Sequence, residues 1–141
     1  MLLKRLCNFL LLLPLFTACS SQSSASELTK ELQTVTSWAA TAQMVGDAWT
    51  RGVVPTAYAK QTLSTAQKKL HKETDNLFKS STDSTQRRTI IQHLQRLEST
   101  VSQMSMAVEQ GDHTAIAQQL KQLSTQEQTI GTLAKTVGRQ Q

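Results

Sequence analysis

The chain has 141 residues, with 15 Lys and Arg side chains against 10 Asp and Glu, and only 4% of its residues are aromatic. That length fits one domain and excludes a second, substrate-binding domain. Few aromatic residues leave little surface on which bases could stack, and a total of five Gly and two Pro argues against an all-β sandwich.

Residues 1–18 have the pattern of a secretory signal peptide. Lys4 and Arg5 supply a short basic region, and an apolar stretch follows from Leu6 to Phe16. This stretch is shorter than the roughly 20 residues that a helix needs to span hydrocarbon. We therefore expect a removable export segment rather than a permanent transmembrane anchor.

The end of this segment, Leu15-Phe16-Thr17-Ala18-Cys19, resembles the lipobox of bacterial lipoproteins. The resemblance implies cleavage before Cys19, acylation of that cysteine and attachment to a lipid bilayer. Phe16 departs from the family's pattern, which prefers Leu, Val or Ile there. Ser20 stands where lipoproteins retained in the inner membrane carry Asp. This implies the periplasmic side of the outer membrane in a Gram-negative cell, and otherwise the outer face of the cell membrane.

Residues 19–26 are expected to be the lipidated cysteine and a flexible tether, because the segment after Cys19 contains only small and polar residues. Cys7 leaves with the signal peptide and Cys19 takes the lipid. The remaining domain, residues 27–141, then has no thiol for a disulfide, a zinc site or a nucleophile. Packing alone has to hold it together.

Four helical stretches follow, separated by Gly, Pro, Ser and Asp residues. The expected helices cover about 26–50, 55–79, 85–110 and 113–137. Apolar residues recur every three or four positions in each, and the third stretch has the most regular set: Ile90, Leu94, Leu97, Val101, Met104 and Val108. Helices of this length joined by short turns lie antiparallel. The predicted fold is all-α, an up-down-up-down four-helix bundle built from two helical hairpins.

Few residues suggest catalysis or metal binding. The three histidines, His71, His93 and His113, have neither a three- or four-residue spacing nor a Glu-x-x-His motif, so we expect no metal site and no cofactor. The chain also lacks the nucleophile motifs of hydrolases, and we expect no enzymatic activity. Glu127 interrupts the apolar stripe of the fourth helix opposite Arg96. We expect these two residues to form a salt bridge that sets the register.

An antiparallel bundle has a proximal end near Cys19 and a distal end away from it. Basic residues expected at the proximal end, facing anionic lipid headgroups, are Lys79, Arg87, Arg88, Lys135 and Arg139. Once Lys4 and Arg5 are removed, 13 basic residues remain against 10 acidic ones. This small excess does not suggest a nucleic-acid partner.

Four large apolar residues are expected together at the distal tip: Trp49, Val53, Val54 and Tyr58. In one interpretation the aromatic side chains close the end of the bundle. In the other, the tip docks a protein partner. The pattern of the chain alone does not separate the two.

These features favour a small, lipid-anchored protein that faces the periplasm and acts by binding. It would be a protein-docking adaptor, or a structural or assembly accessory of the cell envelope, with an envelope protein as its partner. The alternative is a helical chaperone or carrier that holds an apolar ligand between its helices. A carrier needs a pocket of about 300 Å³ or more, whereas an adaptor has a filled core.

Overall fold

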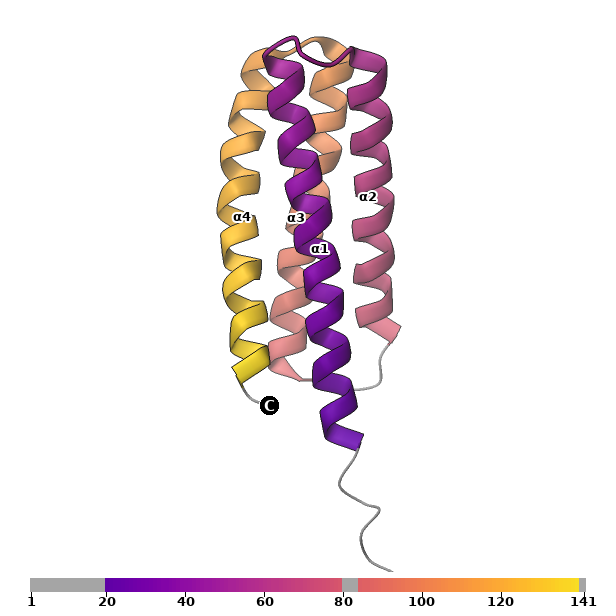
Figure 1. Ribbon diagram of the computed structural model, residues 1–141, viewed down its shortest axis with the longest axis vertical. Helices are drawn as coiled ribbons and strands as arrows, with labels where there is room; N and C mark the ends of the chain where they lie inside the picture. Colours follow the sequence, from indigo (N-terminus) through magenta and orange to yellow (C-terminus); the bar gives the residue numbers. More distant parts are fainter. Residues whose placement is uncertain (1–19, 80–83, 140–141) are drawn as a thin grey trace, which may run out of the picture.

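The computed structural model describes residues 20–79 and 84–139, which form four long α-helices (Figure 1). The helices are α1 (Ser20–Thr50), α2 (Thr56–Lys79), α3 (Thr85–Gln110) and α4 (His113–Arg139). Successive helices run antiparallel and pack side by side, and α4 returns against α1 to close the bundle. The predicted up-down-up-down four-helix bundle is confirmed.

Local signals end the helices where the sequence indicates. Gly52 and Gly111 adopt left-handed conformations with φ of 70° and 71°, which L side chains rarely adopt. After Gly111 turns the chain, the Asp112 N–H donates to the Ala107 carbonyl at 2.9 Å. The Asp112 carboxylate then accepts from the Ala115 N–H at 2.9 Å and caps α4. Both distal connections are therefore short and held by backbone hydrogen bonds.

The predicted apolar stripes form one continuous core. All six residues of the regular set in α3 are buried, and α1 contributes small residues such as Ala39 and Ala42 that let its neighbours approach. The closest approach is at Gly46. A Cβ atom added there would lie 2.6 Å from the Met104 Cε and 3.2 Å from the Leu120 Cδ2. Gly46 thus permits tight packing of α1 against α3 and α4.

The helix boundaries differ from expectation mainly at the start of α1. This helix begins at Ser20, so the segment expected as a flexible tether is helical, while Cys19 and residues 1–18 lie outside the described residues. The segment contains no Gly or Pro, and adding residues to an existing helix costs little compared with starting one. Of the helices in residues 20–79 and 84–139, none combines the length and apolar character needed to cross a bilayer.

The expected register salt bridge is not formed. Arg96 is exposed, and within residues 20–79 and 84–139 neither it nor the half-buried Glu127 makes an ion pair. Arg96 lies one position before Leu97, and a step of one residue turns a helix by about 100° away from the apolar stripe. The interlocking apolar core therefore fixes the helix register without this pair.

Candidate functional site

Trp49 closes the distal end of the bundle from the inside. Its side chain is only 6% exposed, and the indole Nε1 donates to the Thr56 Oγ1 at 3.1 Å. The ring stacks on His113, with centroids 4.4 Å apart and planes 14° from parallel. Trp49 thus joins α1 to the first turns of α2 and α4. For Trp49 these contacts favour the interpretation in which the aromatic side chain closes the end of the bundle, because its indole is packed and hydrogen-bonded within the protein.

Val53 and Tyr58 remain exposed at the same end, at 67% and 54%, whereas Val54 is half-buried and packs against the core. The turn that carries Val53 is well defined. The Gly52 N–H donates to the Trp49 carbonyl at 2.9 Å, and the Val53 N–H donates to the Ala48 carbonyl at 2.8 Å. Two of the four expected tip residues, Val53 and Tyr58, therefore face solvent. The backbone of the turn beside them is held by hydrogen bonds.

Charged residues around the distal tip are already paired. Arg51 forms an ion pair with Asp47 at 2.7 Å, and Lys60 of α2 forms one with Glu109 of α3. Such exposed pairs contribute little to stability, but they reduce the net charge that an approaching partner meets. The side chains of Val53 and Tyr58 are the main apolar groups that this surface leaves exposed to water.

The five basic residues expected at the proximal end do not all face solvent. Lys79, Arg88, Lys135 and Arg139 are exposed on three different helices. Arg87 is half-buried, and its Nη1 donates to the Leu77 carbonyl at 3.4 Å. The Arg87 side chain therefore caps a carbonyl group at the carboxyl end of α2. It is not one of the fully exposed basic residues at this end of the bundle.

Carboxylates of α1 and α2 gather near Arg87. Burial raises the pKa of the Glu31 carboxyl above its ordinary value, and the charges of Glu27 and Glu73 raise it further. The Arg87 guanidinium partly offsets these effects. The ionised form of the Glu31 carboxyl is therefore disfavoured in the folded protein.

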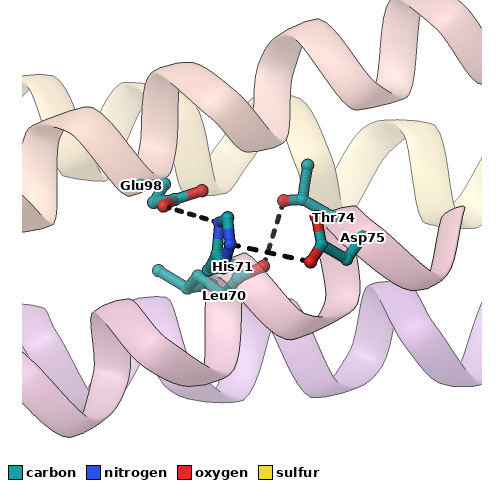
Figure 2. Close-up of polar contacts among 5 residues, drawn as sticks. All are labelled: Leu70, His71, Thr74, Asp75 and Glu98. Carbon is teal, nitrogen blue, oxygen red and sulfur yellow. Dashed lines mark hydrogen bonds and ion pairs between the residues drawn. The ribbon is translucent and has the colours of Figure 1, made fainter. Parts of the chain in front are cut away.

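A second polar cluster lies on the outer seam between α2 and α3. Figure 2 shows His71 between two carboxylates: its Nδ1 lies 3.1 Å from the Glu98 Oε1, and its Nε2 lies 3.6 Å from the Asp75 Oδ2. The neighbouring Thr74 hydroxyl donates to the Leu70 carbonyl at 3.0 Å. Nowhere in the described part of the chain do three or more His, Cys, Asp or Glu side chains gather in a metal-binding arrangement. We therefore interpret the cluster as a surface contact between two helices.

An open groove of about 490 Å³ runs beside Glu98 along the same seam. Its walls are mainly amide and hydroxyl side chains, including Gln67, Gln95 and Ser102, with Met106 as the apolar exception. An apolar ligand in this groove would displace water from groups that it could not hydrogen-bond. The groove therefore does not suit the cargo that a carrier of apolar molecules would hold.

Sequence reasoning missed Phe78, which is 57% exposed in the last turn of α2. Its position one residue after Leu77, and therefore off the apolar stripe, is the signal that could have revealed it.

Comparisons with protein-family models, curated proteins and solved structures gave no match for this chain.

Proposed function

We propose that this chain is a lipid-anchored protein of the bacterial envelope that binds a protein partner through its distal tip. The anchor is the acylated Cys19, and the bundle faces the periplasm from the outer membrane. The observation that carries the proposal is the exposure of Val53 and Tyr58 at the distal end, next to a turn that backbone hydrogen bonds hold in place. In this proposal the protein is an adaptor or assembly accessory rather than an enzyme.

Binding at the distal tip would bury apolar surface at a small cost in conformational entropy and desolvation. Burying apolar surface contributes about 25 cal/mol per Å², so a tyrosine and a valine together supply part of a binding hot spot. Because backbone hydrogen bonds already hold the turn, little conformational entropy is lost when a partner docks. The neighbouring ion pairs leave few charges to desolvate without compensation.

The bundle also separates the tip from the anchor. A 31-residue helix such as α1 is about 46 Å long, so Val53 lies far from the bilayer that holds Cys19. An apolar tip at that distance cannot insert into the membrane on the anchoring side. This supports a protein partner within the periplasm. The polar character of the α2–α3 groove gives no support to the alternative of an apolar-ligand carrier.

Site-specific crosslinking in living cells tests the proposal. A photoreactive amino acid at Val53 should capture a defined protein, whereas the same group at the equally exposed Met44 on α1 should not. The double variant Val53→Asp, Tyr58→Ser should abolish capture from a nearby position and keep the melting temperature, because both side chains are exposed. Val54 is left unchanged because it packs against the core. Capture that is equal at Val53 and Met44, or unaffected by the double variant, would contradict the proposal.

A further inference from the structure

Phe78 exposes an aromatic ring at the proximal end of the bundle. The last turn of α2 lies at the same end as the start of α1 (Figure 1). Phe78 is 57% exposed, although Leu77 beside it is 1% exposed and packs in the core. Phe is among the residues whose side chains enter the boundary between headgroups and acyl chains from a surface-bound helix, where the ring buries apolar area at modest depth. An anchor at Cys19 would bring this end of α2 close to such an interface.

A row of exposed lysines runs along α2, about 80–120° around the helix from Phe78. Lys68, Lys72 and Lys79 share one side of the helix, because the steps of four and seven residues between them correspond to nearly whole turns. Within residues 20–79 and 84–139 none of the three forms an ion pair, in contrast to Arg51 and Lys60 at the distal end. This row therefore offers positive charge to an external anion.

Acidic groups nearby do not cancel the charge of the row. Asp75 lies on the same side of α2, one turn before Lys79, and offsets part of the charge of the row; its carboxylate also lies 3.6 Å from His71. Glu98 of α3 contacts the other nitrogen of that imidazole, at 3.1 Å. Glu73 lies on the opposite flank, where it acts on Glu31 of α1. The outward side of α2 thus keeps a net positive charge from Lys68 to Lys79.

The height of Phe78 above the anchor follows from the helix register. Trp49 contacts Thr56 at the distal end, and 21 residues separate Trp49 from Leu28 and also Thr56 from Leu77. Leu77 is therefore level with Leu28. From Ser20 to Leu28 α1 rises about 12 Å, whereas the headgroup layer of one leaflet is roughly 5–8 Å thick. In an upright bundle Phe78 would stand just above this layer.

A lean of the bundle brings Phe78 to the bilayer. With helix axes about 9 Å apart, tilting α1 by roughly 30° toward α2 lowers the end of α2 from about 12 Å to about 6 Å. That height lies inside the headgroup layer. The same tilt lowers the three lysines, with Lys79 nearest to the phosphates and Lys68 farthest.

We propose that Phe78, Lys79, Lys72 and Lys68 form a lipid edge, through which the bundle leans on its own anionic membrane. The phenyl ring enters the headgroup layer, and the lysines approach lipid phosphates in order of their distance from Phe78. This inference rests on the proposed function, because it takes acylated Cys19 as the anchor. It adds a fixed orientation, in which the distal tip points obliquely into the periplasm and α2 faces the membrane.

Depth measurements on the lipidated full chain test the lipid edge. Single cysteines are introduced as Thr85→Cys, at the start of α3 next to the end of α2, and as Thr136→Cys, and carry a spin label, so that Phe78 is retained. Thr136 is exposed on α4, diagonally opposite α2, and counting from the Trp49–His113 stack places it within about one turn of the height of Phe78. In vesicles of equal parts phosphatidylcholine and phosphatidylglycerol, the label at position 85 should reach the headgroup layer and the label at 136 should remain in water. Equal depths at the two positions would overturn the lean.

Two further measurements separate the ring from the charges. A label at the exposed Thr85, with Phe78 retained, should lose depth when Phe78→Ser is added. Association of the edge should weaken by up to about fivefold in Lys79→Gln, and progressively less in Lys72→Gln and Lys68→Gln, because the attraction decays with distance from the surface. Lys121→Gln, at an exposed lysine of α4 nearer the distal end, is the matched control and should have no effect. An unchanged depth in vesicles of phosphatidylcholine alone would contradict the role of the lysines.

Failure of the anchor and failure of the edge give different results. The mass of the purified chain shows whether Cys19 carries acyl groups, and their absence would contradict the proposed function. Sedimentation of a chain without acyl groups with anionic vesicles then tests the edge directly. Binding that Phe78→Ser and Lys79→Gln both reduce would support the lipid edge, and binding that neither variant changes would exclude it.

Discussion

At the scale of single residues, the carboxylate of Glu31 in the proximal half of α1 is an unfavourable charge. Glu31 is partly buried and lies near Glu27 and Glu73, with Arg87 as the compensating cation. Its folded-state pKa therefore lies above the value in the unfolded chain. Folding takes up protons between these two values, so stability falls as the pH rises through that window, and the full cost is present above it.

Glu31→Gln should therefore increase the stability of the protein at neutral pH. The amide keeps the shape of the side chain and removes the charge that burial and the neighbouring carboxylates disfavour. Below the ordinary glutamate pKa both proteins carry a neutral side chain, and the difference should disappear. Thermal unfolding of the two proteins across the acid range measures this. A difference independent of pH would show that the charge of Glu31 is not its cause.

At the scale of elements, each helix is defined by its apolar stripe and by its ends. The stripe of α3 is the most regular, and all its members are buried between the neighbouring helices. The ends are marked by left-handed glycines at two connections and by the side-chain caps Ser84 and Asp112. These are local features, which is why the six helix boundaries at the three connections agree with the sequence within one residue.

Leu97→Ala should cost about 2–5 kcal/mol, because it leaves a cavity in a fully buried part of α3. Gln92→Ala, on the exposed side of the same helix, should change the stability by less than about 0.5 kcal/mol. Urea unfolding of both variants measures the two effects. Similar losses in the two would mean that the helix is rotated about its axis relative to the structure.

Glycines at two helical positions should respond in opposite directions. Gly46→Val should destabilise the bundle by about 1–3 kcal/mol, because its side chain would overlap Met104 and Leu120. Gly131→Ala in α4 meets no atom within 4 Å and should stabilise by about 0.5–1 kcal/mol through helix propensity. The melting temperatures of the two variants, compared with that of the unchanged protein, measure these effects. A stabilising Gly46→Val would show that α1 does not pack closely here.

At the scale of the whole molecule, the bundle places two candidate surfaces at opposite ends. The distal end presents Val53 and Tyr58 above a plug made by Trp49, and the proximal end presents Phe78 and exposed basic residues. A rigid helical rod joins them, since α1 runs from Ser20 to Thr50 without a break. Such an arrangement suits a protein that holds one surface at a set distance from another.

Cys19→Ser should abolish the incorporation of labelled fatty acid and release the protein from membranes. The substitution removes the thiol that the lipobox resemblance assigns to acylation, and the lipid edge alone is too weak to hold the chain stably. Membrane fractionation of cells with each variant measures the effect. A wild-type chain without acyl mass, together with a variant that still sediments with membranes, would contradict the anchor.

Apart from the start of α1, the sequence by itself determined the four helices, their connections and most residues of the core, because helix caps and apolar periodicity act over a few residues. Only the tertiary structure decided which way the remaining large and charged side chains point. Trp49 turns inward because Thr56 and His113 of two other helices receive it. Arg87 turns toward the end of α2, and His71 meets a carboxylate of α3. Each of these contacts joins two different helices. No local pattern encodes the helix rotations that bring the partners together.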